Sequence, residues 1–357
     1  MKVLFDHQLF SYQRFGGASK YFAMLLNSLP KDFWDTTTLF SNNEYVKNLN
    51  LLQGYHNFLP DKYFRGQGKI MNILNKPYSI YRLLRQDYDV FHQTHFETYC
   101  IKPNGKKPMV TTFHDINFST YSPNPHIVKL QAESLERADA VIAISHNTKK
   151  DLLSLFNINE EKVHVIHHGI DSPHYMSEER VYTFPYILYV GSRQNHKNFS
   201  TFVKAYSVFQ QKYPEIKVIC TLRAFSDSEM AMFASYGVQD KFIHVQVSEQ
   251  MMPMLYRDAL FFVFPSLYEG FGMPILEAMI NDCPVVLSDA SCFPEIAGNA
   301  GLYFDPHDSD SMLDKMVKMA ESEARRSKFR KLGRAKVKEY SWDRCAELHM
   351  NVYRSLI

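Results

Sequence analysis

The chain has 357 residues, of which 45% are hydrophobic and 22% charged, and its formal net charge is +2 at pH 7. This composition excludes a disordered chain, and the near balance of charge argues against nucleic acid as a partner. The length allows two domains of ordinary size. Five scattered cysteines without metal spacing are typical of reduced thiols, so we expect a cytoplasmic protein.

The first half of the chain alternates short apolar runs with helical patterns. The first ten residues lack a long apolar core, so we expect a first strand there and not a signal peptide. Strands are expected over residues 3–5, 90–92, 109–113, 140–144 and 163–167, with helices over 18–29 and 127–137. A second series begins at Tyr186. Its expected strands lie near residues 187–190, 216–221, 242–247, 260–264 and 284–287, and its helices near 199–213, 251–257 and 274–279.

Strands that alternate with helices predict a parallel sheet covered on both faces. The sequence therefore predicts an α/β fold with two doubly wound, Rossmann-like domains, over residues 1–170 and 171–340. A last helix over residues 341–357 is expected, with Ser341 as its cap. Open sheets of this kind bind ligands at the carboxyl ends of their strands.

The string Phe15-Gly16-Gly17-Ala18 follows the first expected strand and opens a helix. Two glycines let the backbone approach a phosphate or a sugar closely. The full dinucleotide fingerprint is absent, so a nicotinamide site is weakly supported. A plain turn is the alternative interpretation.

Residues 59–86 are rich in cations and apolar side chains. Such a stretch can lie on an anionic membrane surface. Pro77 interrupts it, so we do not expect one clean helix. The alternative is an exposed connector whose apolar residues pack on the N-terminal domain.

His114 follows the strand expected over residues 109–113 and precedes Asp115, which could orient its ring. A lone histidine is more often a structural hydrogen-bonding residue than a catalyst. His92 and His95 end another strand and are candidates for the acceptor side. A zinc site is not indicated, because a third ligand is missing.

Arg193 and Lys197 lie in a loop that leaves one expected strand and enters a helix. A guanidinium fork and a compact ammonium both suit a diphosphate, and they could stabilise charge on a leaving nucleoside diphosphate. The alternative is a pair of solvated cations.

The most informative stretch is PSLYEGFGMPILEAMINDCPVVL, residues 265–287, in which Glu269 and Glu277 lie eight positions apart. Gly270, Gly272 and Pro274 between them predict a tight loop that turns into a helix. Proline favours the first helical position, which would make Met273 the cap. Methionine cannot cap a helix, so the free amides are open to a phosphate.

This stretch resembles the E-x7-E signature of retaining GT-B glycosyltransferases, in particular the large family-four group, and the likeness covers most of the chain. The resemblance implies that the two domains face a central cleft. It also implies that Glu269 holds hydroxyls of a donor sugar and that Glu277 binds the ribose. The backbone of Phe271, Gly272 and Met273 would cover the sugar and the phosphate.

By the same resemblance, Gly16 and Gly17 would lie beside the donor diphosphate, and Arg193 and Lys197 would pair with it. His114 would lie near the primary alcohol of the donor sugar and the reacting centre. The N-terminal domain would bind the acceptor, and the last helix would pack back on that domain.

The implied reaction is transfer of a hexose from a GDP- or UDP-sugar to a hydroxyl of a glycan or lipid-linked acceptor, with retention and without a metal or another cofactor. The strings RFGGASKY and GSRQNHKN are similar to those of bacterial enzymes that build surface polysaccharide, often mannosyltransferases. We therefore expect mannose as the transferred sugar. If residues 59–86 contact lipid, we expect the protein to act at the inner face of the membrane. The alternatives are a nucleotide-sugar epimerase of the same fold and a non-catalytic glycan- or nucleotide-binding protein.

Overall fold

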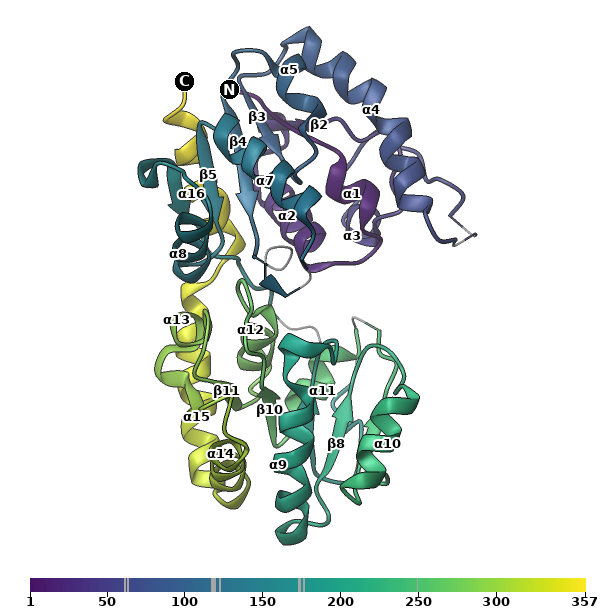
Figure 1. Cartoon of the computed structure of the whole chain (residues 1–357), viewed down its shortest axis with the longest axis vertical. Coiled ribbons are helices and arrows are strands. Elements are labelled where there is room, and N and C mark those ends of the chain that lie inside the picture. Colours follow the sequence, from purple (N-terminus) through teal and green to yellow (C-terminus); the bar gives the residue numbers. More distant parts are fainter. Residues whose placement is uncertain are drawn as a thin grey trace. The chain divides into compact units, whose positions relative to one another are not determined.

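The computed structural model describes residues 1–60, 62, 64–116, 120–121, 123–172, 175, 177–248 and 250–357. The chain forms two compact units (Figure 1). Unit 1 comprises Met1–Gly169 together with Ser341–Ile357, and unit 2 comprises Ile170–Tyr340. Among the described residues, no helix combines the length and the apolar character needed to cross a bilayer.

Unit 1 contains a parallel six-stranded sheet in the order β2-β1-β3-β4-β5-β6. The strands are β1 (Val3–Phe5), β2 (Trp34–Thr36), β3 (Val90–Gln93), β4 (Met109–Phe113), β5 (Ala140–Ala143) and β6 (Val163–Val165). Strands β1, β3, β4 and β5 are buried along their whole length. Helices on both faces account for this burial and for the continuous apolar runs in the sequence.

The helices of unit 1 are α1 (Gln8–Tyr12), α2 (Gly17–Ser28), α3 (Glu44–Asn48), α4 (Gln67–Arg85), α5 (Ile101–Asn104), α7 (Pro125–Arg137), α8 (His146–Leu155) and α16 (Trp342–Arg354). Although α16 ends the chain, its yellow ribbon lies among the N-terminal elements in Figure 1. Ser341 caps it by accepting a hydrogen bond from the amide of Arg344. Its buried side chains, including Trp342 and Tyr353, join the core that packs on β1 and α2.

Unit 2 repeats the architecture with the strand order β12-β11-β10-β7-β8-β9, again all parallel. Its strands are β7 (Tyr186–Tyr189), β8 (Lys217–Cys220), β9 (Phe242–His244), β10 (Phe261–Phe264), β11 (Val285–Ser288) and β12 (Gly301–Phe304). Its helices are α9 (Phe199–Lys212), α10 (Asp227–Ser235), α11 (Met252–Asp258), α12 (Met273–Ile280), α13 (Phe293–Ala297), α14 (Ser309–Glu321) and α15 (Glu323–Lys336). The two sheets confirm the predicted doubly wound α/β class.

Two details of the prediction were wrong. Helix α4 runs without interruption from Gln67 to Arg85, with Pro77 inside it. Proline removes one hydrogen bond to the carbonyl four residues earlier, here that of Ile73. Both residues are exposed, so water can satisfy that carbonyl. Strand β2 was not predicted, because its sequence Trp-Asp-Thr at the sheet edge carries no apolar run.

Candidate functional site

The topology of unit 2 selects two loops as the candidate site. Strands β8 and β9 extend the sheet on one side of β7, whereas β10, β11 and β12 extend it on the other. Doubly wound sheets bind ligands outside the carboxyl ends of the strands where this reversal occurs. The reversal places residues 190–198, after β7, beside residues 265–272, after β10. The amide of Leu267 donates to the carbonyl of His196 at 2.7 Å, which ties the two loops together.

The Lys197–Glu269 ion pair lies between these loops. The ammonium Nζ of Lys197 is 2.6 Å from Oε1 of Glu269, and the hydroxyl of Ser266 donates to the same oxygen at 2.8 Å. The two side chains are 17% and 16% exposed, so they are shielded but still open to a ligand. In the described part of the chain, these side-chain contacts reach only Oε1, which leaves Oε2 as an acceptor for a hydroxyl.

The backbone of Glu269 is held from the loop that follows β11. The hydroxyl of Ser291 accepts from the amide of Glu269 at 3.2 Å and donates to its carbonyl at 2.7 Å. The thiol of Cys292 donates to the same carbonyl. Ser266 and Ser291 were not predicted as site residues. Their signal in the sequence is their position, since each lies within three residues of the end of a buried strand.

Lys197 is held by an unusual backbone conformation next to it. Asn198 has φ of 53°, in the left-handed region that asparagine tolerates better than most residues. Its side chain donates to the carbonyl of Pro306 at 2.7 Å and accepts from the hydroxyl of Thr201 at 2.6 Å. These contacts fix the turn from which the lysine extends.

Helix α12 begins at Met273, so the predicted cap was wrong by one residue. The cap is Gly272, which has φ of 84° and makes no side-chain cap hydrogen bond. A Cβ there would lie 3.1 Å from the side chain of Ile275, which a small shift could relieve, so it is the backbone conformation that favours glycine. Since glycine has no side chain to cap the helix, the expectation that these amides are open to a phosphate stays a prediction. The side chain of Phe271 is buried, and its predicted contact with the donor through the backbone stays a prediction.

Glu277 lies inside α12, eight residues after Glu269 and half-buried. The hydroxyl of Tyr256, on α11, donates to Oε2 of Glu277 at 3.2 Å. Burial, followed by the charge of Glu277, raises the pKa of Tyr256. The phenol therefore keeps its proton and orients the carboxylate. The sequence offered no signal for Tyr256.

Arg193 was predicted to bind the diphosphate, a role that stays a prediction, and its guanidinium is already engaged within unit 2. Its guanidinium is 0% exposed, and Nε donates to Glu229 at 2.7 Å. The terminal nitrogens donate to the carbonyls of Thr221, Arg223 and Ala224. Four of its five N–H groups are used, so Arg193 fixes the loop after β8 and Lys197 is the cation left for a ligand in this pair.

Unit 1 has its own topological reversal at β1, between β2 and β3. Asp6 follows β1 there and is fully buried. Burial raises the pKa of Asp6 to about 7, against hydrogen bonds from Thr94 and Gln8 that lower it. Sequence reasoning missed Asp6, although the string VLFDH places it directly after a buried strand.

Gly16 caps helix α2 of unit 1 and Gly17 begins it. The space around the two glycines differs. A Cβ at Gly16 would lie 2.2 Å from the side-chain oxygen of Gln13, whereas nothing lies within 4 Å of one at Gly17. That oxygen accepts from the amide of Ser19 at 3.1 Å, so Gln13 occupies the start of the helix. A side chain at Gly16 would displace Gln13, whereas one at Gly17 would meet open space, and the predicted contact of both glycines with the donor diphosphate stays a prediction.

His114 lies directly after β4 and is half-buried. Burial, with a smaller contribution from His95, lowers the pKa of His114 to about 3, so the ring is neutral. Its Nε2 atom is buried and has no hydrogen-bond partner among the described residues.

His92 was a candidate for the acceptor side, but it is a core residue whose ring nitrogens contact Tyr353 and Thr112 at 2.7 and 2.9 Å.

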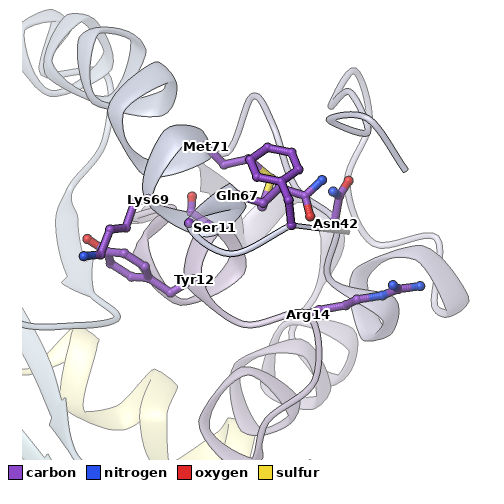
Figure 2. A pocket seen from close by; sticks show the side chains of 10 residues that line it. Ser11, Tyr12, Arg14, Asn42, Gln67, Lys69 and Met71 are labelled. Carbon is purple, nitrogen blue, oxygen red and sulfur yellow. The ribbon is translucent and has the colours of Figure 1, made fainter. Parts of the chain in front are cut away.

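A cavity of about 240 Å³ opens in unit 1 between α1 and the start of α4. Figure 2 shows Tyr12 and Lys69 on one side of it and Arg14 and Asn42 on the other. Gln67 lines it between these groups. The lining mixes cations, amides and the two aromatic rings of Tyr12 and Phe64, which suits a polar ligand such as a sugar.

Two doubly wound units with a lysine–carboxylate pair at a reversal point are typical of two-domain α/β enzymes that bind nucleotides. Two family descriptions match the chain, "Glycosyl transferases group 1" over residues 176–336 and "Glycosyltransferase Family 4" over residues 15–174. Together the matches run through most of both units. The chain belongs to the group 1 glycosyltransferases.

Relatives with assigned names include O-antigen chain mannosyltransferase B of Escherichia coli, 29% identical over 294 residues, which are 76% of this chain and 75% of that protein. O-antigen chain mannosyltransferase RfbU of Salmonella typhimurium is 32% identical over 207 residues, which are 56% of this chain and 57% of that protein.

Among solved structures, Anabaena HepE in complex with UDP and glucose is similar with a TM-score of 0.79 and 17% identity, over 99% of this chain and 100% of that one. Sucrose-phosphate synthase from Thermosynechococcus elongatus has a TM-score of 0.74 and 18% identity, over 100% and 99% of the two chains. At these identities the likeness establishes the shared fold, and it confirms the predicted GT-B class.

Proposed function

We propose that this chain is a mannosyltransferase that moves mannose from a nucleotide-diphosphate donor to a hydroxyl of a growing surface polysaccharide. The family and the named O-antigen mannosyltransferases among its relatives support the sugar and the pathway class. The observation that carries the proposal is the position of Glu269, which Lys197 and Ser266 hold through one oxygen at the reversal point of unit 2.

The sugar, the diphosphate and the ribose of the donor would each contact a different group of unit 2. Oε2 of Glu269 accepts hydroxyls of the sugar, and Lys197 neutralises the diphosphate. The uncapped start of α12 at Gly272 offers amides and a favourable dipole to the same phosphates. Glu277, oriented by Tyr256, accepts from the ribose hydroxyls.

Donor binding would break the resting ion pair. Lys197 turns to the phosphates and so exchanges one negatively charged partner for another, while Glu269 keeps the hydrogen bond from Ser266 and gains neutral hydroxyls of the sugar. Charge that develops on the leaving nucleoside diphosphate is then stabilised by Lys197 and the helix end. We propose retention, with the leaving phosphate helping to deprotonate the acceptor on the same face of the sugar.

We propose further that no divalent cation is needed, since Lys197 and α12 can supply the positive charge. Asp-x-Asp sequences, which bind metals in many glycosyltransferases, occur at residues 87–89 and 308–310. Asp308 caps α14 and Asp89 accepts from the amide of Lys2 at 2.7 Å, so structural roles account for both. Transfer measured with and without EDTA tests this point, and a loss of activity restored by Mg²⁺ would contradict it.

The acceptor is proposed to bind unit 1, with the cavity beside Tyr12 and Lys69 as its entry. His114 would contact the donor sugar through Nε2, for which the described residues offer no hydrogen-bond partner. A lipid-linked acceptor would bring the protein to the inner face of the membrane, in contact through residues 59–86. Asp61 and Tyr63 in that stretch lie outside the described residues.

The test is a panel of GDP- and UDP-sugars, first for thermal stabilisation and then for transfer to mannose-containing acceptors. GDP-mannose should stabilise the protein most, and the product should keep the anomeric configuration of the donor by NMR. Glu269→Gln should lower kcat by at least about 100-fold, whereas Glu321→Gln, which removes the same charge from the surface of α14, should not. A donor converted without acceptor would favour the epimerase, and binding without any turnover would favour a non-catalytic protein.

A further inference from the structure

Tyr12, the last residue of α1, belongs to two groups of residues in unit 1. It lines the cavity together with Lys69, as Figure 2 shows. The centre of its ring is also 5.8 Å from the centre of the ring of His95, which lies in the loop after β3. Tyr12 is 36% exposed, so a ligand that covers it contacts both groups.

Hydrogen bonds hold the ring of Tyr12 in place. Its hydroxyl donates to Oε1 of Glu97, in the same loop as His95. The side chain of Asn72 donates to that oxygen at 2.8 Å, and Nζ of Lys76 is 2.7 Å from Oε2. Burial, followed by Glu97, raises the pKa of Tyr12, so the phenol keeps its proton. The ring is therefore oriented before a ligand arrives, which lowers the entropy lost on binding.

His95 offers an unused hydrogen-bonding group. Its Nδ1 atom is buried, and nothing in the described parts of the chain forms a hydrogen bond with it. Burial lowers the pKa of His95 to about 4, against the charge of Glu97, which raises it, so the ring is neutral at pH 7. A neutral imidazole both donates and accepts, as a hydroxyl does. A buried nitrogen without a partner costs free energy, and a bound hydroxyl would recover it.

The surface around Tyr12 suits sugars, and its size suits more than one. A pyranose has C–H groups on its faces and hydroxyls around its edge, so it packs on an aromatic ring while its hydroxyls bind polar side chains. The cavity, at about 240 Å³, is smaller than the roughly 300–1,000 Å³ of sites for drug-sized ligands, so it suits a single sugar ring. A glycan that fills the cavity and also reaches His95 therefore contains at least two sugars.

The order of the two sugars follows from the sheet of unit 1. Strand β3, which precedes His95, pairs with β4, which precedes His114. His114 is predicted to lie near the donor sugar. The hydroxyl that accepts mannose therefore belongs on the His95 side of Tyr12, and the preceding sugar belongs in the cavity.

We infer that Tyr12 is the platform of a two-sugar acceptor site in unit 1. The terminal sugar of the acceptor stacks on the ring of Tyr12 and hydrogen-bonds to His95, while the sugar before it fills the cavity beside Lys69. Glu97 is a positioning residue that acts through Tyr12. The inference deepens the proposed function, on which it rests for a glycan acceptor, because it makes the substrate a chain of at least two sugars.

The length of the acceptor tests the inference. Transfer from GDP-mannose is measured to methyl α-mannoside and to panels of α-linked mannobiosides and mannotriosides. We expect kcat/KM to rise at least about tenfold from the monosaccharide to the best disaccharide, and less than about threefold from there to the trisaccharide. Lys69→Met should remove most of the first rise. Lys62→Met, which removes the same charge from the exposed loop before α4, should keep it.

Variants on the other side of the site should act on the acceptor alone. Tyr12→Ala should raise the KM of the disaccharide at least about tenfold and leave the KM of GDP-mannose unchanged. Tyr12→Phe keeps the ring but loses the bond to Glu97, so its rise should be smaller. His95→Phe should raise the KM of monosaccharide and disaccharide by the same factor, because both contain the terminal sugar. Tyr236→Ala, at 40% exposure in unit 2, should change neither KM.

The positioning role of Glu97 has its own readout. Glu97→Gln keeps an oxygen that can accept from Tyr12, so it should retain more of the affinity for the disaccharide than Glu97→Ala does. A purely structural role would lower the melting temperature and kcat in both variants and leave the KM of the acceptor unchanged.

The outcomes separate this inference from the proposed function. Equal kcat/KM for the monosaccharide and every disaccharide overturns the inference even if transfer is normal, and so does a rise that survives in Lys69→Met. If Tyr12→Ala does not fold, Lys69→Met carries the test, because Lys69 is exposed. Without any transfer, calorimetric titration of the full chain with the same sugars decides. A disaccharide bound at least about tenfold tighter than the monosaccharide supports the acceptor site and contradicts only the proposed function, whereas equal or absent binding overturns the inference.

Discussion

Acidification should destabilise unit 1 through His349, a buried ring on α16. Its Nδ1 is 2.7 Å from the carbonyl oxygen of Cys345, which can only accept, so Nδ1 carries the proton. Nε2 therefore accepts from the hydroxyl of Tyr21, 2.7 Å away. A second proton would break this hydrogen bond and place a charge in the core.

The size of the effect follows from the pKa. Burial lowers the pKa of His349 from 6.5 to about 4, against the opposing hydrogen bond to Cys345. The unfolded state binds a proton at a pH where the folded state excludes it. The stabilisation is complete above about pH 6.5 and is lost as the pH falls toward 4. Between pH 7 and pH 5 this one ring should cost about 2 kcal/mol of unfolding free energy, at about 1.4 kcal/mol per unit.

Urea unfolding at pH 7 and pH 5, followed by tryptophan fluorescence, measures this loss. The two tryptophans of the chain, Trp34 and Trp342, both belong to unit 1, so their signal reports that unit. His349→Gln keeps a donor and an acceptor but cannot titrate, and it should lose about 2 kcal/mol less than the wild type does. His126→Gln, at an exposed position on α7, should behave as the wild type. Equal losses in the wild type and His349→Gln would refute the reasoning.

Three further substitutions test unit 2. Gly272→Ala should lower the stability of unit 2 by about 1–3 kcal/mol, because φ of 84° strains any other residue. The control is Gly17→Ala in unit 1. Nothing lies close to a Cβ at Gly17, so this change should leave the thermal unfolding of unit 1 nearly unchanged. Lys197→Met should weaken GDP binding at least about tenfold by calorimetry, and Lys204→Met, exposed on α9, should not. Arg193→Lys should lower the melting temperature, since lysine cannot replace four fixed hydrogen bonds. Normal melting with lost GDP binding in that last variant would return Arg193 to the diphosphate site.

The fold was largely predictable because both sheets are buried on two faces. A strand such as β10, with Phe261–Phe264 wholly buried, must be a continuous apolar run, and such runs are visible in the sequence. Edge strand β2 is half-buried and left no such run. Helix α4 was predicted wrongly because Pro77 argues against a helix, and the sequence does not show that the carbonyl it leaves free faces water.

The loops of the candidate site were predictable from their position, but the roles of their cations were not. Arg193 and Lys197 follow the same strand and look equivalent in the sequence. They differ only in whether carbonyls and Glu229 surround the charge, which depends on the loop after β8. Ser291 lies in the loop after β11 and Tyr256 on α11, each more than 20 residues from its partner, so the folded unit brings them to Glu269 and Glu277. The roles of all these residues toward a donor stay predictions.

The central claim is that Glu269 binds the sugar of the donor, and calorimetric titration of GDP-mannose and GDP tests it most directly. The two ligands differ by the mannose, so the ratio of their affinities isolates the contribution of the sugar. Glu269→Gln should reduce this ratio at least about tenfold, with no loss of GDP affinity, since a hydrogen bond to a charged acceptor contributes about 1.5–3 kcal/mol. A ratio identical to that of the wild type would contradict the account.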